Sequence, residues 1–269
     1  MLAADILEIA GKKFTSRLIA GTGKYQNMTM MVEAIKASGA EIVTVAIRRL
    51  DLENPNEKTI LDYLDWTKYS VLPNTAGCRT VEEALFVARL GRTVTNSNWV
   101  KLEVIPDPKY LFPDPVGTFM AAKQLLKEGF VVLPYIHADP VLASRLEELG
   151  CATVMPLGSA IGSGQGIHTE DEIKMIVEQC TVPVIVDAGL GVPSDACQAL
   201  EMGADAVLVN TGIAQSTDPV LMATAFKEGV IAGRKAHIAG RMTRKSFAVS
   251  SSPDAVSYTH LTLPTSELV

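Results

Sequence analysis

The sequence has few of the residues from which disulfide-bonded or metal-binding domains are built. Its 269 residues include four cysteines and four histidines. The cysteines lie far apart and form no C-x-x-C pair, at Cys78, Cys151, Cys180 and Cys197. The histidines have no ligand spacing either, at His137, His168, His237 and His260. We therefore expect free thiols in a reducing cytoplasm, without a disulfide framework or a tightly bound metal.

The chain also has little that would place it in a membrane or on a nucleic acid. Its longest uncharged stretch, around residues 151–169, is interrupted by glycines and a proline, which a lipid-buried helix would not tolerate well. Asp5 and Glu8 interrupt the basic-then-apolar order that a signal peptide requires. Lys and Arg total 24 against 30 Asp and Glu, a formal charge of −6, so we expect no extended basic surface for nucleic acid.

What the sequence does have is enough apolar residues for a large core, 48% hydrophobic against 20% charged. They gather in eight short runs, each followed by a stretch of helical character. The eight runs are Arg17–Thr22, Glu41–Ile47, Val71–Gly77, Trp99–Ile105, Phe130–Ile136, Cys151–Leu157, Val182–Gly189 and Ala204–Gly212. The helical stretches include 31–39, 81–91, 119–129, 140–150, 171–180 and 194–203, and several end in glycine, as a helix C-terminus often does.

This alternation predicts an α/β fold in which eight parallel strands close into a (β/α)8 TIM barrel. Strands that are apolar along most of their length are typical of a parallel sheet covered by helices. Eight such units fill about 250 residues. The alternative is an open, doubly wound sheet, but residues 21–27 after the first strand do not complete the G-x-G-x-x-G pattern of that fold.

We expect one catalytic domain over residues 1–255. The final segment, Val256–Val269, does not continue the pattern of strands and helices, and its first ten residues resemble a translated sequencing adapter. We therefore expect a non-native tail there and exclude it from the fold and the function. The alternative is an ordinary polar tail, which would carry no chemistry either.

Charged residues inside one predicted strand mark the candidate active site. Alternation along Trp99–Ile105 places Lys101 and Glu103 on one face with Trp99, and aliphatic residues on the other. The aliphatic face should meet the helices, so Lys101 and Glu103 should project into the barrel. Asp187 ends another apolar strand, at the edge where TIM-barrel active sites lie. The alternatives are a structural ion pair for the first two and a helix N-cap or loop position for Asp187.

A lysine and two carboxylates at such a site suggest imine chemistry. Burial lowers the pKa of a lysine, so its neutral amine can attack a carbonyl, and the protonated imine acidifies the adjacent carbon. A carboxylate such as Glu103 or Asp187 would remove that proton. Glycine-rich loops after three consecutive strands would hold a phosphate through backbone N–H groups, at Gly158–Gly166, Asp187–Ala196 and Asn210–Ala214.

Seven motifs make the sequence similar to the bacterial thiazole synthases of thiamine biosynthesis. They are NTAGCRTVEEA, NWVKLEVIPDP, LFPDP, GFVVLPY, MPLGSAIGSGQG, VPVIVDAGLGVPSDA and ADAVLVNTGIA, in order between residues 4 and 255. The resemblance implies a TIM-barrel transferase that makes thiazole phosphate from 1-deoxy-D-xylulose 5-phosphate, dehydroglycine (2-iminoacetate) and sulfur from a thiocarboxylated sulfur-carrier protein. It also implies a lysine Schiff base without metal or cofactor, a dehydroglycine-producing enzyme as partner, and a homotetramer.

The same motifs imply roles for individual residues. Lys101 would form the Schiff base with the sugar ketone, and Glu103 and Asp187 would transfer protons. Five residues match the positions that hold the sugar phosphate: Gly162, Ala188, Gly189, Asn210 and Thr211. The sequence departs modestly from the family, with His137 and Ala138 where Thr and Asp are frequent, and Gly212 where Ala is usual. We expect a structural role for His137.

Two other functions share part of this pattern. An aldolase or transaldolase would also use a barrel lysine on a sugar phosphate, but it would cleave the sugar without a carrier protein. A non-catalytic barrel that serves as a docking scaffold would not require Lys101, Glu103 and Asp187 as a set.

Overall fold

The computed structural model describes residues 5–50 and 58–251, and the predicted tail, Val256–Val269, lies outside the described residues. The chain forms two units, Met1–Ala239 and Gly240–Val269. The described part of the second unit, residues 240–251, consists of irregular chain and bends without a helix or strand. The fold and the site described below belong to the first unit.

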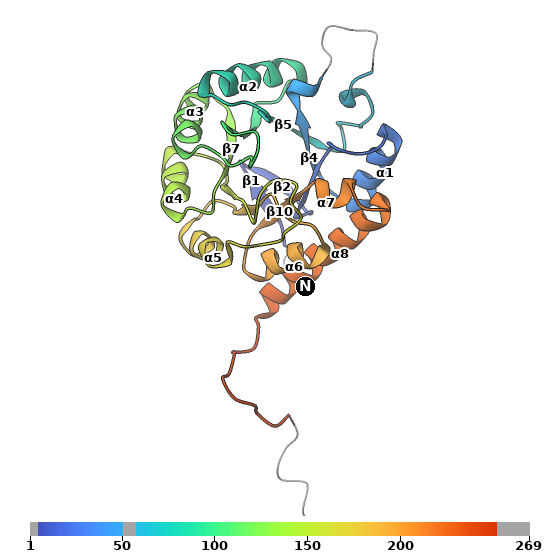
Figure 1. The fold of residues 1–269 in the computed structure, drawn as a ribbon, viewed down its shortest axis with the longest axis vertical. Helices are drawn as coiled ribbons and strands as arrows, with labels where there is room; N and C mark the ends of the chain where they lie inside the picture. Colours follow the sequence, from blue (N-terminus) through green and yellow to red (C-terminus); the bar gives the residue numbers. More distant parts are fainter. Residues whose placement is uncertain (1–4, 51–57, 252–269) are drawn as a thin grey trace, which may run out of the picture. The chain divides into compact units, whose positions relative to one another are not determined.

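Eight parallel strands form the centre of the first unit (Figure 1). They are β3 (Leu18–Gly21), β4 (Ile42–Ala46), β5 (Ser70–Asn74), β6 (Trp99–Leu102), β7 (Val131–Ile136), β8 (Met155–Pro156), β9 (Ile185–Val186) and β10 (Ala206–Val209). Neighbours pair in the order β8-β7-β6-β5-β4-β3-β10-β9. Parallel bridges Val154–Val184 and Leu157–Asp187 then join the segments around β8 and β9, so the sheet closes on itself. The predicted (β/α)8 barrel is confirmed, and the open-sheet alternative is wrong.

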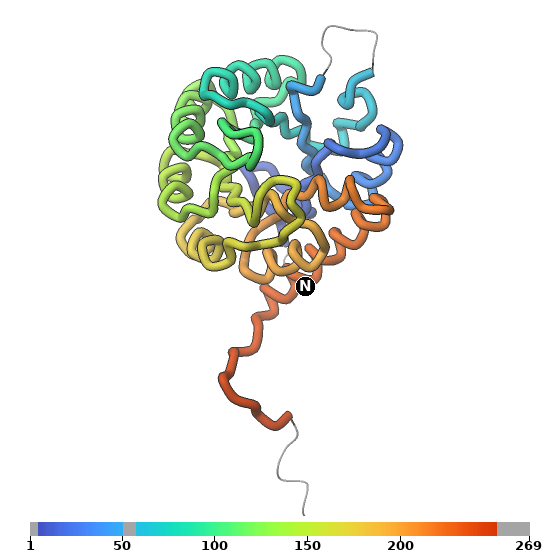
Figure 2. The backbone as a smooth tube through the Cα atoms, viewed as in Figure 1, coloured from blue at the N-terminus to red at the C-terminus, as the bar shows by residue number. Residues whose placement is uncertain are grey.

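Helices surround the barrel as a ring (Figures 1 and 2). They are α1 (Met28–Ser38), α2 (Val81–Thr95), α3 (Pro115–Lys127), α4 (Pro140–Leu149), α5 (Glu170–Gln179), α6 (Pro193–Glu201), the short α7 (Thr211–Ala214) and α8 (Pro219–Ala239), with 3-10 turns η1 (Ile47–Arg49) and η2 (Ile60–Asp62). Within residues 5–50 and 58–251, none of them has the length and apolarity needed to span a bilayer.

Two of these helices end at a glycine, as the sequence predicts, and a third does not. Gly39 and Gly150 follow α1 and α4 in the left-handed conformation, as predicted, with φ of 64° and 103°. The stretch predicted to end at Gly91 instead continues to Thr95. Gly91 is buried inside α2, where a Cβ would lie 3.1 Å from Ile47 Cγ1, so this glycine serves the close packing of the helix.

The core has two layers that the strand alternation separates. One layer lies between strands and helices and includes Val100, Leu102 and Val104 of the β6 segment. The other fills the barrel, where Trp99 packs with inward residues of the neighbouring strands. An antiparallel hairpin that the sequence analysis missed, β1 (Leu7–Ile9) and β2 (Lys12–Phe14), joins this inner layer. Phe14 meets Trp99 edge-on at 6.1 Å, so the hairpin packs at the amino end of β6 and leaves the carboxyl ends for the site.

Asp5 ties the segment before this hairpin to two parts of the barrel. Its carboxylate accepts hydrogen bonds from Arg17 at 2.7 and 3.0 Å, and from Arg234 of α8 at 2.9 Å. The hydrogen bond from Arg234, followed by that from Arg17, holds the pKa of Asp5 below its ordinary value. Arg17 is only 6% exposed, so its guanidinium depends on such partners.

We expect Asp5→Asn to lower the free energy of unfolding by about 1–2 kcal/mol near neutral pH, a range that allows for the partial exposure of Asp5. Because the folded-state pKa is lowered, the stabilisation is present above the unfolded-state pKa and is lost as the pH falls through the folded-state pKa. Urea denaturation should therefore show the difference from wild type shrinking below about pH 4. Asp171→Asn, at an 85% exposed side chain, is the control with little effect. A difference independent of pH would contradict the ionic contribution.

Candidate active site

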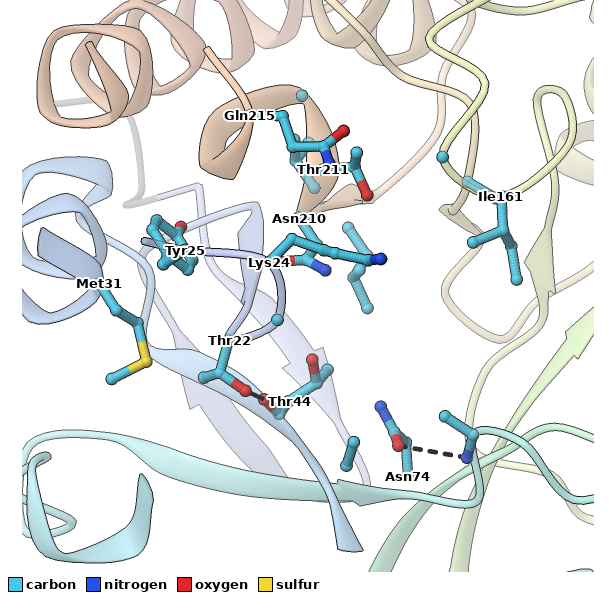
Figure 3. A pocket seen from close by; sticks show the side chains of 18 of the residues that line it. Thr22, Lys24, Tyr25, Met31, Thr44, Asn74, Ile161, Asn210, Thr211 and Gln215 are labelled. Atoms are coloured by element: carbon cyan, nitrogen blue, oxygen red, sulfur yellow. Dashed lines mark hydrogen bonds between the residues drawn. The ribbon is translucent and has the colours of Figure 1, made fainter. Parts of the chain in front are cut away.

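The residues singled out from the sequence line one cavity of about 790 Å³. Figure 3 shows this cavity, with side chains converging from several strands and from α7. The cavity brings together all eight predicted site residues: Lys101, Glu103, Gly162, Asp187, Ala188, Gly189, Asn210 and Thr211. Their convergence follows from the closed barrel, because parallel strands present their carboxyl ends at the same edge.

Lys101 lies between two carboxylates in the interior of the barrel. Its Nζ is 2.6 Å from Asp187 Oδ2 and 3.2 Å from Glu103 Oε1, and the three side chains are only 5 to 7% exposed. The predicted alternation along the strand is therefore confirmed. Lys101 and Glu103 do form an ion pair, as the structural alternative required, and Asp187 extends it to a triad. The N-cap alternative for Asp187 is wrong, because α6 begins six residues later, at Pro193, and the side chain lines the cavity.

The charge state of Lys101 differs from the sequence prediction. Burial lowers the pKa of a lysine, but here the attraction of Asp187 and then Glu103 outweighs burial and holds the pKa of Lys101 above its ordinary value. The expected lowered pKa is thus wrong, since both carboxylates lie in direct contact with Lys101. Lys101 is an ammonium ion whose proton must pass to an acceptor before the nitrogen can act as a nucleophile.

Two residues that the sequence analysis did not single out support this triad. Thr75 Oγ1 donates to the carbonyl oxygen of Glu103 and accepts from its N–H, both at 2.7 Å, which fixes the backbone that carries the carboxylate. Tyr135 of β7 is fully buried, and its ring centre is 5.6 Å from Lys101 Nζ. Burial, with the two nearby carboxylates, raises the pKa of Tyr135, so the phenol stays neutral. Tyr135 lies two residues after the inward-facing Leu133, so alternation along β7 could have shown that Tyr135 also faces the barrel interior.

Glycine-rich loops form another wall of the cavity. Ala188 and Gly189 are both left-handed, with φ of 58° and 82°, and a Cβ on Gly189 would come within 1.9 Å of Ser159 Oγ. The N–H of Gly166 donates to the carbonyl of Gly189 at 2.9 Å, which holds the loop after β8 against the loop after β9. A Cβ on Gly162 would lie 3.8 Å from the hydroxyl of Thr211, the first residue of α7. Three loops therefore meet where backbone N–H groups can approach an anion.

His137 lies outside this cavity lining, and its ring packs against Phe112 with centroids 4.8 Å apart. Partial burial lowers the pKa of His137, which Asp139 opposes. Its structural role stays a prediction.

Residues 8–253 match the family described as "Thiazole biosynthesis protein ThiG". The chain is 59% identical over 256 residues to the thiazole synthase of a Synechococcus species, with 93% of each chain covered. It is 58% identical over 255 residues to the thiazole synthase of Acaryochloris marina, again with 93% of each covered. It is also 57% identical to the bifunctional protein ThiO/ThiG of a Synechocystis species, covering 93% of this chain and 39% of that protein.

Solved structures extend these similarities to three dimensions. A chain of the BexX/CysO complex of Amycolatopsis orientalis has 31% sequence identity and a TM-score of 0.81, covering 90% of this chain and 98% of that chain. Thiamine phosphate pyrophosphorylase from Pyrococcus furiosus shares only the fold, at 14% identity and a TM-score of 0.54, with 81% of this chain and 96% of that chain covered.

Proposed function

Because this chain belongs to the ThiG family of thiazole synthases, the sulfur transferases that make the thiazole of thiamine, we propose the substrates and the mechanism that its cavity serves. The substrates are 1-deoxy-D-xylulose 5-phosphate, dehydroglycine and the sulfur of a thiocarboxylated carrier protein. The observation that carries the proposal is the buried contact of Lys101 with Asp187 and Glu103, in one cavity with the glycine-rich loops. That combination suits an imine-forming lysine beside a phosphate site.

In the first step the sugar phosphate binds and its ketone meets Lys101. Backbone N–H groups of the glycine-rich loops hold the phosphate, through the five residues Gly162, Ala188, Gly189, Asn210 and Thr211. Asp187, 2.6 Å from Lys101 Nζ, accepts the ammonium proton. The free amine adds to the ketone carbon, and loss of the ketone oxygen as water leaves a protonated imine.

In the next steps the carboxylates move protons while Lys101 holds the carbon chain. One carboxylate removes the proton from the hydroxyl-bearing carbon beside the imine, which acts as the electron sink, and reprotonation at the imine carbon leaves a carbonyl at the neighbouring position. The sulfur of the carrier's thiocarboxylate adds to the carbon of that carbonyl, and the carrier leaves with the carbonyl oxygen as an ordinary carboxylate, so the sulfur stays on the carbon chain. Loss of water, attack on dehydroglycine and ring closure then release Lys101 as a free amine. Glu103, 3.2 Å from Lys101 Nζ, shares this work with Asp187.

A protein partner for this barrel is supported by the related BexX chain, whose solved structure is a complex with CysO. By analogy we propose that a sulfur-carrier protein docks here and delivers its C-terminal thiocarboxylate to the cavity. The homotetramer, the cytoplasmic location and the enzyme that supplies dehydroglycine remain predictions from the family.

The mechanism predicts a covalent adduct on Lys101. When the protein is mixed with the sugar phosphate alone and reduced with borohydride, peptide mass spectrometry should find the reduced adduct on Lys101. Because the pKa of Lys101 is raised, the fraction of free amine rises about tenfold per pH unit in the neutral range. The rate of trapping should therefore increase between about pH 6 and pH 9.

Folded protein that binds the sugar phosphate without forming the adduct would contradict the proposed mechanism, and a trapping rate that stays constant across this pH range would contradict the raised pKa. The same mixture of protein and sugar phosphate distinguishes a thiazole synthase from the alternative function, an aldolase. Cleavage of the sugar phosphate without carrier protein and dehydroglycine would favour an aldolase over a thiazole synthase that works through an imine.

A further inference from the structure

The cavity holds a second group of nitrogen donors, separate from the glycine-rich loops. Lys24 follows β3 and Arg49 ends η1 directly after β4, and both line the cavity. Figure 3 shows the side chain of Lys24 extending into the cavity from the segment after β3. The only acidic residues among the described lining are Glu103 and Asp187, and both are engaged by Lys101. Lys24 and Arg49 therefore give this part of the cavity a positive charge.

Gly23 allows two nitrogen donors to lie close together. A Cβ on Gly23 would lie 3.0 Å from Arg49 Nη1 and 3.2 Å from Asn210 Nδ2. Gly21, two residues earlier, makes room for Asn210 itself, since a Cβ there would come within 2.4 Å of the Asn210 Cβ. Gly21 and Gly23 therefore allow the amide of Asn210 and the guanidinium of Arg49 to converge beside this segment, closer than side chains at these two positions would permit.

Two further observations concern the cations Arg49 and Lys24. Arg48 is engaged outside the cavity, by the Gly77 carbonyl at 2.6 Å and Glu83 at 3.2 Å, whereas Arg49 faces the cavity. Lys24 has a φ of 72°, a left-handed conformation that costs a residue with a Cβ on the order of 1 kcal/mol. The fold therefore holds Lys24 in a strained backbone while its ammonium group enters the cavity.

We propose that Arg49, Lys24 and the side-chain amide of Asn210 form a second anion subsite, which binds the carboxylate of dehydroglycine. The inference rests on the proposed function, in which the glycine-rich loops are occupied by the sugar phosphate. A guanidinium and an amide N–H that converge beside Gly23 in the cavity lining suit a planar carboxylate. Two neighbouring subsites would hold two anionic reactants in one cavity with Lys101, and Asn210 would serve both, the phosphate through its backbone and the carboxylate through its side-chain amide.

Arg49→Gln tests the subsite, because it removes the charge at an exposed side chain without disturbing the buried triad. With dehydroglycine formed from glyoxylate and ammonia, its apparent KM in thiazole formation should rise about tenfold or more, equivalent to about 1.4 kcal/mol. The concentration of sugar phosphate that half-saturates borohydride trapping should stay within about twofold of wild type. Gly23→Ala, whose Cβ would push the two donors apart and which keeps every charge, should give the same pattern.

Arg79→Gln is the matched control for a general loss of positive charge. Arg79 is an exposed cation in the segment between β5 and α2, outside the cavity lining, so both measurements should be unchanged. Calorimetric titration with oxamate, an unreactive carboxylate of similar size, gives a readout that needs no catalysis. We expect oxamate to bind Arg49→Gln and Gly23→Ala about tenfold or more weakly than wild type.

Three results would overturn the subsite. Weaker trapping of the sugar phosphate by Arg49→Gln would assign these donors to the phosphate. A raised KM for the carrier protein alone would assign them to its thiocarboxylate, and unchanged constants for all three reactants would leave them without a ligand. If wild type forms no adduct on Lys101 but binds oxamate in a manner that depends on Arg49, the subsite stands and the proposed imine mechanism falls.

Discussion

Replacing Lys101 by arginine is expected to abolish thiazole formation and the borohydride-trapped adduct while the barrel remains folded. The guanidinium keeps a positive charge near Asp187 and Glu103, which contact Lys101 Nζ at 2.6 and 3.2 Å. It does not lose its proton under these conditions, so it supplies no free amine to attack the ketone. Removal of a covalent nucleophile should lower the turnover number by about 10³-fold or more. Steady-state assays and mass spectrometry of the reduced protein measure the two losses.

Lys101→Met provides the comparison that distinguishes the contribution of the positive charge to stability from the contribution of the amine to catalysis. It removes the amine and also the cation, which leaves two carboxylates facing each other in a buried site. We expect this variant to lose about 3–5 kcal/mol of stability, since breaking a buried ion pair leaves uncompensated charge. Lys101→Arg should lose much less, although both variants are inactive. If Lys101→Arg kept thiazole formation, Lys101 would act through its charge and the imine mechanism would be wrong.

The position of this lysine could be predicted because one strand carries its own pattern. Alternation between Trp99 and Val104 separates an aliphatic face from a face with two charges, and the period of two fixes which residues share a side. The barrel followed in the same way from eight apolar strands with helices between them. The position of Asp187 could be predicted too, since a charged residue after an apolar run indicates the end of a strand.

The charge state of Lys101 could not be predicted in this way. Its strongest partner, Asp187, directly follows β9, and their 2.6 Å contact depends on the closure of the sheet between the segments around β8 and β9. Sequence spacing gives burial, which lowers a lysine pKa, but it does not give the distance to a carboxylate from another strand. Once that distance is known, attraction outweighs burial and the direction of the shift reverses.

Other parts of the cavity could not be predicted from the sequence for the same reason. Lys24 lies in a loop and Arg49 ends the 3-10 turn η1. Both are exposed cations, which are common on any protein surface and by themselves indicate no binding site. Their relation to Asn210 depends on the pairing of β3 with β10, which joins the beginning of the barrel to its end. The role of a glycine in the loop after β3 can be inferred only when the side chains that pack around it are known.

Asp187→Asn is expected to separate imine formation from formation of the ring. Asparagine has nearly the same shape, and its oxygen can still accept the N–H of Ala188, which Asp187 Oδ1 accepts at 2.7 Å. It carries no charge and cannot take up a proton from carbon. Glu103 still pairs with Lys101, so the variant should fold. We expect thiazole formation to fall by about 10²- to 10⁴-fold, the usual contribution of a general base.

The pH dependence of trapping distinguishes this role from a structural one. The raised pKa of Lys101 comes chiefly from Asp187, so its loss should lower that pKa and shift the trapping profile toward lower pH. The position of the profile, rather than the absolute rate, is the measurement, since Asp187 also accepts the first proton. Glu103→Gln should produce a smaller shift in the same direction, because its oxygen lies farther from Lys101 Nζ, at 3.2 Å.

A profile that is unchanged or moves toward higher pH would show that Asp187 does not set the charge of Lys101. A variant that shifts the profile and still makes thiazole at the wild-type rate would leave the proton transfers on carbon to Glu103.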